Sequence, residues 1–216
     1  MIVAIDGPAG AGKSSVARAV ARSLGMTFVD TGAMYRAVAL FALEEGISLD
    51  DGEALAAAVR RCRIEVGDGR VVLDGREVGE RIRAPDVTAA VSRAAAHPQV
   101  RDAMASLQRA AARGDVVMEG RDIGSTVAPE ADLKIFLTAS LEERAHRRLR
   151  DGRARDDEAT HAQVAAALAA RDAADSSRRA SPLTKAPDAI ELDTTDMTFE
   201  QVVAEVVRLA EERAHG

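Results

Sequence analysis

Aromatic side chains are scarce in this sequence: they make up 2% of its 216 residues, with one Tyr and no Trp. Proteins that bind single-stranded nucleic acid by base stacking need such side chains, so the composition argues against this class. A formal net charge of −6 also argues against a broad nucleic-acid surface. The single cysteine, Cys62, excludes an intrachain disulfide framework and a cysteine-built zinc site.

Long hydrophobic runs are missing as well. No apolar run approaches the roughly 20 residues that a membrane span needs. The opening segment MIVAIDG lacks the basic region and the long apolar region of a secretory signal. We therefore expect a cytoplasmic protein with no membrane partner. Lysine is rare too, since only three of the 29 basic residues are Lys, so position must decide which of the many arginines carry function.

The length and the hydrophobic pattern predict one globular α/β domain. A chain of 216 residues with 47% hydrophobic residues can bury a full core. Short apolar runs predict strands at residues 2–5, 27–29, 115–119, 133–137 and 189–192. Helical periodicity predicts helices at residues 14–24, 33–43, 85–96, 98–112, 140–150, 158–175 and 199–213. Strands that alternate with helices indicate a parallel sheet, and residues 62–77 predict a small antiparallel hairpin in an inserted lobe.

A glycine-rich motif follows the first strand. Gly7-Pro8-Ala9-Gly10-Ala11-Gly12-Lys13-Ser14 matches G-x-x-x-x-G-K-[ST]. In such a loop, consecutive backbone N–H groups and the start of a helix surround phosphate oxygens. Lys13 places a cation on the outer phosphates, and Ser14 offers a hydroxyl to Mg²⁺. The motif predicts binding of a nucleoside triphosphate, which GTPases, motor ATPases and small-molecule kinases share.

The segment Asp30-Thr31-Gly32-Ala33-Met34-Tyr35-Arg36 contains a candidate phosphate ligand. Arg36 lies about one turn into a predicted helix whose start carries Thr31. An arginine reads phosphate with two parallel hydrogen bonds. Taken alone, however, this pattern is better explained by a solvated helix arginine, with Asp30 as an ordinary helix cap.

The segment Glu119-Gly120-Arg121-Asp122 ends an apolar strand. Ligands of open α/β sheets lie beyond the carboxyl ends of the strands. An acid in this place resembles a Walker-B arrangement, so Glu119 is expected to hold Mg²⁺ through a water molecule, with Arg121 and Asp122 in the same crevice. A salt-bridged turn is the structural alternative.

Basic residues crowd one predicted helix end and the loop after it: Arg144, Arg147, Arg148, Arg150, Arg153 and Arg155. Like charges at this density repel one another unless anions or acids neutralise them. A loop that closes over a polyphosphate would use them. A solvated segment compensated by Asp151, Asp156 and Asp157 is an equally good explanation.

Three charged residues, Arg171, Asp175 and Arg178, are spaced to share one face of the last long helix before residue 180. An acid between two bases can bind a sugar hydroxyl while the bases bind phosphate. Ion pairing within the helix is an equal alternative.

Taken together, these motifs resemble those of the bacterial cytidylate kinases. The resemblance runs nearly end to end and rests on IDGPAGAGKSS, DTGAMYR, EGRDIGSTVAPEADLKIFLTAS with EERAHRR, RDAADSSR and SPL. It implies a three-layer P-loop NTPase fold with a central parallel sheet flanked by helices. It further implies a core (about 1–35, 98–148 and 158–216), a β-containing monophosphate-binding insert (about 36–97) and a short lid (about 149–157).

The resemblance also implies roles at matching positions. ATP would be held by Gly7, Pro8, Ala9, Gly10, Ala11, Gly12, Lys13, Ser14 and Ser15. The acceptor nucleotide would be held by Thr31, Arg36, Ser92, Arg101, Arg121, Asp122, Arg171, Asp175 and Arg178. Catalysis would fall to Lys13 and to the lid residues Arg147, Arg148 and Arg153, and Mg²⁺ to Ser14 and Glu119. Thr31 stands where a serine is common in the family, and it keeps the hydroxyl.

The activity that the resemblance implies is transfer of the γ-phosphoryl group of ATP to CMP or dCMP by a monomer. Within the acceptor site, Arg36, Arg121 and Arg178 would bind phosphate, and Arg101 and Asp122 would read the cytosine edge. Two alternatives stay open. Another P-loop kinase, such as an adenylate or shikimate kinase, would differ in its acceptor. A GTPase-type switch would need an N-K-x-D motif, which the sequence lacks.

Overall fold

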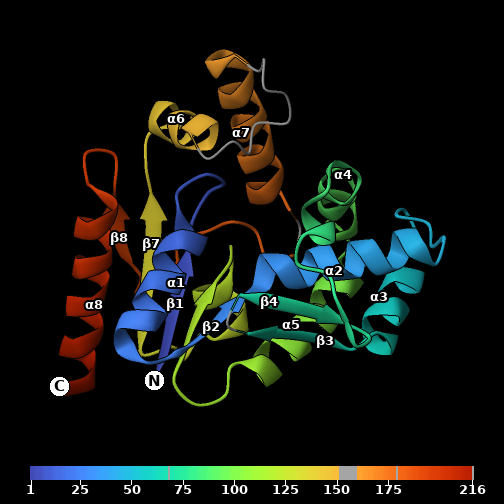
Figure 1. Ribbon diagram of the computed structural model, residues 1–216, viewed down its shortest axis with the longest axis horizontal. Coiled ribbons are helices and arrows are strands. Elements are labelled where there is room, and N and C mark those ends of the chain that lie inside the picture. Colours follow the sequence, from blue (N-terminus) through green and yellow to red (C-terminus); the bar gives the residue numbers. More distant parts are fainter. Residues whose placement is uncertain (68, 151–159, 179, 216) are drawn as a thin grey trace.

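The computed structural model describes residues 1–67, 69–150, 160–178 and 180–215. Its centre is a parallel sheet with the strand order β2-β6-β1-β7-β8 (Figure 1). The strands of this sheet are β1 (Ile2–Asp6), β2 (Thr27–Asp30), β6 (Val116–Glu119), β7 (Leu133–Thr138) and β8 (Ile190–Asp193). The helices that surround it are α1 (Lys13–Leu24), α2 (Thr31–Glu44), α5 (Pro98–Ala111), α6 (Leu141–Arg150), α7 (His161–Ser176) and α8 (Phe199–His215). This confirms the predicted α/β fold.

The sheet separates two hydrophobic cores because successive side chains of a strand point to opposite faces. In β1, Val3 and Ile5 pack into the core that α1 and α8 cover, whereas Ala4 packs into the core beneath α2. All three side chains are completely buried. Strands of a parallel sheet that are covered on both faces are expected to read as unbroken apolar runs, which is why β1 could be predicted from five residues.

A second lobe lies beside the sheet at the right of Figure 1. It contains α3 (Gly52–Arg61), a 3₁₀ turn (Arg81–Arg83), α4 (Pro85–Ala94) and an antiparallel sheet of β3 (Ile64–Gly67), β4 (Arg70–Leu73) and β5 (Arg76–Glu77). The predicted hairpin at 62–77 is therefore confirmed. This lobe and α2 share the larger core, into which Leu55, Leu73 and Ile82 are fully buried.

Two elements differ from the sequence-based expectation. Helix α3 was not predicted, because its run of alanines gives a weak pattern, with Leu55 and Val59 as the large buried residues. Its start is marked by Asp51, whose side chain accepts a hydrogen bond from the Ala54 N–H at 2.9 Å. A short π-helical turn (Ile123–Val127) after β6 was not predicted either.

The expected lid lies mostly outside the described residues. Of residues 149–157, the structure describes only 149 and 150, at the end of α6. The long helix predicted from residue 158 is described from His161, where Thr160 and Gln163 form a capping box. Within the described part of the chain, no helix is long and apolar enough to cross a membrane.

Candidate active site

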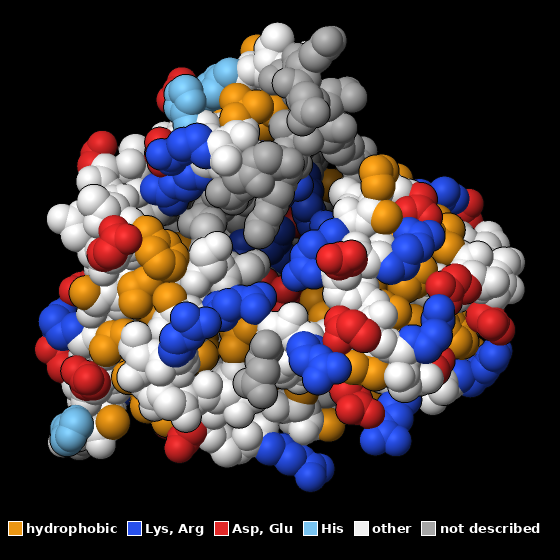
Figure 2. All heavy atoms as spheres, viewed as in Figure 1, with side chains coloured by type: hydrophobic (Ala, Val, Ile, Leu, Met, Phe, Trp, Pro, Cys, Tyr) orange, Lys and Arg blue, Asp and Glu red, His pale blue; other side chains and the backbone are white. Residues whose placement is uncertain are grey.

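A cleft of about 1330 Å³ lies where the parallel strands reach their carboxyl ends. It runs between the glycine-rich loop, the start of α2, the second lobe and helices α6 and α7, and Lys and Arg side chains gather around the hollow (Figure 2). Every described residue of the predicted site lines this cleft except Gly7 and Pro8. Arg153 lies outside the described residues. The fold thus brings together candidates as far apart in the sequence as Ala9 and Arg178, which are 169 positions apart.

The glycine-rich loop joins β1 to α1 and needs glycine at specific places. Gly10 and Gly12 have φ of +79° and +88°, in the left-handed region that favours glycine. A Cβ at Gly7 would lie 2.0 Å from the Leu137 carbonyl oxygen, so no larger residue fits there. Helix α1 then begins at Lys13, which directs its positive N-terminal end at the loop. The loop is therefore shaped as an anion-binding turn.

The ammonium of Lys13 is buried at the base of this loop, where it donates to the Pro8 carbonyl oxygen at 2.8 Å. Next to it, Ser14 Oγ donates to Glu119 Oε1 at 2.7 Å. Burial lowers the pKa of Lys13, with Arg121 acting in the same direction. Burial also raises the pKa of Glu119, helped by the charge of Asp30. A hydroxyl, a carboxylate and a cation thus meet beside the anion-binding turn.

The start of α2 is tied to the neighbouring strand and to the second lobe. Thr31 Oγ1 donates to the backbone carbonyl of Glu119 at 2.7 Å, and Asp30 caps the helix by accepting from the Ala33 N–H. Arg36 is half-buried and donates to Thr88 Oγ1 at 2.8 Å. The interpretation of Arg36 as a solvated helix arginine is therefore wrong, whereas the capping role of Asp30 is confirmed.

A buried acid organises the arginines on the other side of the cleft. Asp175 is 2% exposed and accepts from Arg121 Nε at 2.8 Å and from Arg178 Nη2. Burial acts to raise the pKa of Asp175, but Arg121 and Arg178 hold it below its usual value. Helix α7 ends at Ser176, so Arg178 reaches Asp175 from the segment beyond the helix rather than from its face. Ion pairing within α7 alone does not explain this cluster, because Arg121 pairs with Asp175 from the segment that follows β6.

A second buried ion pair lines the same cleft. Arg101 Nη2 donates to Asp122 Oδ2 at 2.8 Å, and the Arg101 guanidinium lies 5.3 Å from the centre of the Tyr35 ring. Among the described residues, Arg101 Nε and Arg171 Nε are the buried side-chain polar atoms without a hydrogen-bond partner. Burial also lowers the pKa of Arg171 to about 10. Buried N–H groups of this kind usually have a partner, so these two are exceptions, and both belong to residues that line the cleft.

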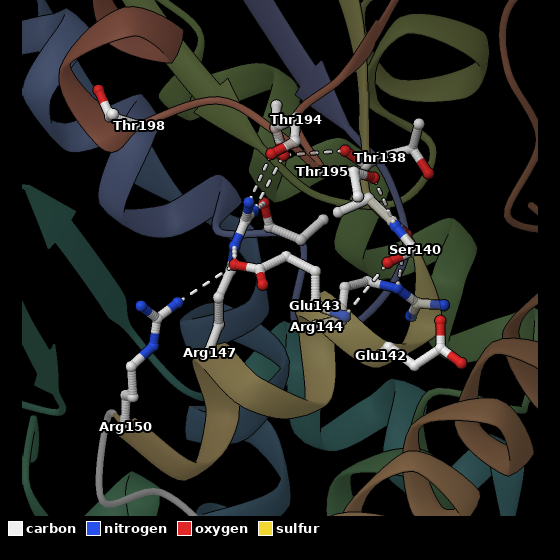
Figure 3. A network of polar contacts seen from close by, with 12 residues as sticks. Thr138, Ser140, Glu142, Glu143, Arg144, Arg147, Arg150, Thr194, Thr195 and Thr198 are labelled. Atoms are coloured by element: carbon white, nitrogen blue, oxygen red, sulfur yellow. Dashed lines mark hydrogen bonds and ion pairs between the residues drawn. The ribbon is translucent and has the colours of Figure 1, made fainter.

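The arginines of α6 are engaged with protein groups (Figure 3). Arg147 donates to Glu143 at 2.8 Å and to the carbonyl oxygen of Thr194 at 2.6 Å, and Arg150 donates to the same Glu143 carboxylate. Arg144 is buried and paired with Asp172. Charge compensation among the described residues thus comes from Glu143 and Asp172. The predicted partners Asp151, Asp156 and Asp157, like Arg155, lie outside the described part.

Sequence reasoning missed two acids that shape the site. Asp6 accepts from the N–H groups of Ile123 and Gly124 at 2.9 and 2.8 Å, which fixes the turn after β6. Burial raises the pKa of Asp6 to about 6. Asp172 accepts from the Ala9 N–H of the glycine-rich loop. A polar residue at the end of an apolar strand was the available signal for Asp6, whereas no local pattern marks Asp172.

Comparison with known proteins gives a consistent result. The model of the cytidylate kinase family matches residues 3–212. The cytidylate kinase of Caldanaerobacter subterraneus is 47% identical over 99% of this chain and 96% of its own length. That of Desulfitobacterium hafniense is 50% identical over 96% of this chain and 91% of its own. That of Streptomyces avermitilis is 48% identical over 99% and 94%. With its P-loop fold and these relatives, the chain belongs to the cytidylate kinase family and is a phosphotransferase.

Proposed function

We propose that this chain transfers the γ-phosphoryl group of ATP to the 5′-phosphate of CMP or dCMP, giving ADP and CDP or dCDP. The observation that carries the proposal is the single cleft that joins the glycine-rich loop to the arginines around Asp175. Family membership supports a nucleoside monophosphate as the acceptor. The reaction must bring two anions together, and a chain of net charge −6 does this with local clusters of arginine.

The donor triphosphate would lie against the glycine-rich loop. Backbone N–H groups of residues 10–15 and the N-terminus of α1 would offer it partial positive charge. Lys13, which now donates to the Pro8 carbonyl, would turn its donors to the outer phosphates. Its burial makes the interaction strong, because a charge pair is less screened in a low-dielectric site.

The acceptor phosphate would lie among Arg36, Arg121 and Arg178, with Arg171 beside them. One of its oxygens attacks the γ-phosphorus, a P–O bond forms, and the bond from the γ-phosphorus to the β,γ-bridging oxygen breaks as ADP leaves. The attacking oxygen is already anionic, so no strong general base is needed. Catalysis is then positioning and charge neutralisation. Arg147 and Arg148 line the donor side, and we propose that they neutralise charge on the transferring group.

The cytosine ring would be read by Asp122 and Arg101. Cytosine carries an amino donor that suits the Asp122 carboxylate, whereas uracil has an oxygen in that place, and an unpaired buried acceptor is costly. Arg101 would orient this carboxylate, because its Nη2 donates to Asp122 Oδ2 at 2.8 Å. Thr31 lies nearby at the start of α2. Ser92, Arg171 and Asp175 are proposed to face the sugar, since all three line the cleft.

Ser14 and Glu119 fit a magnesium ion. Their side-chain oxygens lie 2.7 Å apart beside the loop, and a hydroxyl together with a carboxylate is a donor set that Mg²⁺ prefers. When bound, the ion would neutralise charge on the phosphate oxygens of ATP. Burial and the charge of Asp30 raise the pKa of Glu119, and an ion beside it would favour the charged form.

The division of the chain also belongs to this proposal. Residues 36–97 would form the monophosphate-binding insert, because Arg36, Thr88 and Ser92 all face the cleft from it. Residues 149–157 would form the lid and exclude water during transfer. The cytoplasmic location and the monomeric state stay predictions.

An acceptor panel tests the proposal. ADP release is measured with ATP and each of CMP, dCMP, UMP, AMP and shikimate at equal concentrations. We expect CMP or dCMP to give the highest kcat/KM. A higher value with AMP or shikimate would assign the chain to another P-loop kinase activity, and nucleotide binding without phosphorylation of any acceptor would favour a switch.

A further inference from the structure

The two peptide groups that flank Ala9 in the glycine-rich loop are bound by side chains from two helices. The Ala9 N–H donates to Asp172 Oδ1 of α7 at 2.9 Å. Arg144 Nη1 of α6 donates to the Ala9 carbonyl oxygen at 2.8 Å. Arg144 and Asp172 also form an ion pair with each other. These three residues therefore close a ring of contacts, in which each has two partners.

Lys13 holds the same stretch of backbone from the cleft side. Its ammonium donates to the Pro8 carbonyl oxygen at 2.8 Å, so the peptide between Pro8 and Ala9 has its C=O on Lys13 and its N–H on Asp172. When Lys13 turns to a phosphate, this C=O loses its partner. Arg144 and Asp172 lie behind the loop and are not among the described residues that line the cleft. We therefore expect their contacts with Ala9 to persist when Lys13 turns to a phosphate.

Apolar packing holds the loop at the same place. Ala9 belongs to a small hydrophobic cluster with Ala145 of α6 and Val164 and Leu168 of α7, separate from the two main cores. At Gly10, a Cβ would lie 3.3 Å from Arg144 Cβ and 3.4 Å from Leu168 Cδ2. The loop thus packs directly against α6 and α7, and both helices hold it through polar and apolar contacts.

We propose that Arg144 and Asp172 are positioning residues for the phosphate donor, which hold the glycine-rich loop in its triphosphate-binding shape without touching the nucleotide. The inference rests on the proposed function, because it assigns ATP to this loop. A carboxylate with two donors and a guanidinium with three acceptors, the third being the Ala139 carbonyl oxygen, fix the orientation of both peptide planes at Ala9. The pair is well shielded, since the two side chains are 10% and 18% exposed. Its contacts are therefore little weakened by solvent.

The decisive variant is Asp172→Asn. The carboxylate uses one oxygen for each donor, whereas an amide has one acceptor oxygen, so either the Ala9 N–H or Arg144 loses its hydrogen bond to residue 172. We expect the Kd and the KM for ATP to rise about tenfold or more, while the KM for CMP stays within about twofold. Calorimetry gives the Kd for ATP in the absence of CMP, and steady-state kinetics give both KM values.

Asp188→Asn is the matched control. Asp188 also pairs with a buried cation, Lys134, at 2.7 Å, but neither residue lines the cleft. We expect this variant to leave both nucleotide constants within about twofold of the wild type. A rise of the ATP and CMP constants by the same factor in Asp172→Asn, or an unchanged Kd for ATP beside a lower Tm, would show that the pair is only structural.

Arg144→Lys keeps the charge and covers the case in which Asp172→Asn does not fold. Arg144 contacts the Ala9 carbonyl and Asp172 through Nη1, while its Nε donates to the Ala139 carbonyl at 3.1 Å and fixes the plane of the guanidinium. A lysine lacks that second, orienting donor, so the Kd for ATP should rise by several-fold to tenfold. No change in that Kd would overturn the proposal. If the wild type binds ATP but does not phosphorylate CMP, the proposed function fails, and the ATP binding of these variants still decides the role of the pair.

Discussion

The two ends of the cleft hold their positive charge in different ways. At the loop end, Lys13 rests on a carbonyl oxygen, and the remaining positive potential comes from backbone N–H groups and the start of α1. At the other end, guanidinium groups are paired with buried acids, Arg101 with Asp122 and Arg121 with Asp175. The loop end therefore relies on backbone shape, and the arginine end relies on side chains that are oriented in advance by carboxylates.

This difference predicts different responses to substitution. Loss of Lys13 at the loop end removes charge that is proposed to act on the transferring phosphoryl group, so it should act mainly on kcat. A change at the arginine end disturbs a side chain that is proposed to orient the acceptor, so it should act mainly on the KM for CMP and on the choice of base. The predictions below can break or sharpen this contrast.

Lys13→Ala should have the largest effect. Removal of the buried Lys13 ammonium should lower kcat by about 10³-fold or more, because this ammonium is proposed to neutralise charge that develops on the transferring group. The fold should persist, since Lys13 sits in a site where burial already disfavours its charge. ADP release and the Tm are measured together. Near-normal turnover would remove the loop from the mechanism.

Asp6 links the two ends of the cleft. It is the last residue of β1, directly before the glycine-rich loop, and its carboxylate accepts hydrogen bonds from the turn after Glu119. Burial raises its pKa from 3.8 to about 6 in the folded state, so ionisation of Asp6 costs stability. The folded protein binds the extra proton between these two values. Protonation of Asp6 therefore contributes up to about 3 kcal/mol to the free energy of unfolding. This contribution is fully present below about pH 4 and is lost by about pH 6.

Asp6→Asn provides the comparison for this pH effect. The free energy of unfolding is measured by urea denaturation of both proteins between pH 4 and pH 7. As the pH rises from 4 to 6, the wild type should lose stability relative to the variant, and above pH 6 the difference should level off. Parallel curves over this range would contradict the assignment.

Arg121→Lys tests the arginine end. The lysine keeps the charge but loses the planar guanidinium that contacts Asp175 and that is proposed to bind the acceptor phosphate. The KM for CMP should rise about 30-fold, which corresponds to about 2 kcal/mol, while the KM for ATP changes by less than about twofold. The ATP constant serves as the internal control. An equal rise in both constants would erase the contrast between the two ends.

Asp122→Ala should have the smallest effect on the kinetic constants, and this effect should be on the preference for cytosine over uracil. The ratio of kcat/KM values for CMP over UMP should fall about tenfold, because the acceptor that rejects uracil is gone. Asp122→Asn, which keeps one acceptor oxygen, should retain more of the preference. The Tm is recorded for each variant, since Arg101 loses its buried partner. An unchanged ratio in the alanine variant would remove Asp122 from base recognition.

The loop end could be predicted from the sequence because its binding groups are contiguous. Eight residues, 7–14, supply the backbone, the lysine and the hydroxyl, with a strand before them and a helix after them. Strands buried on both faces and amphipathic helices were predicted for the same reason: their pattern is local. The alanine-rich α3 was missed because its apolar stripe rests on few large side chains.

The arginine end could be proposed only through its motifs and their resemblance to a family. Its groups come from α2, α5, the end of β6 and the segment after α7, and no local pattern states that Arg121 will meet Asp175. The interpretation of six crowded arginines went partly wrong for the same reason. The partner of Arg144 is Asp172, 28 positions away on another helix, and only the packing of α6 on α7 brings the two together.

A bisubstrate ligand tests most directly whether one cleft holds both nucleotides. An adenosine joined to a cytidine through five phosphates should compete with ATP and with CMP, and it should bind at least about tenfold more tightly than either nucleotide alone, since the second contact becomes intramolecular. Inhibition kinetics against each substrate give the answer. Competition with both substrates is the predicted result, whereas competition with ATP alone would contradict a shared cleft.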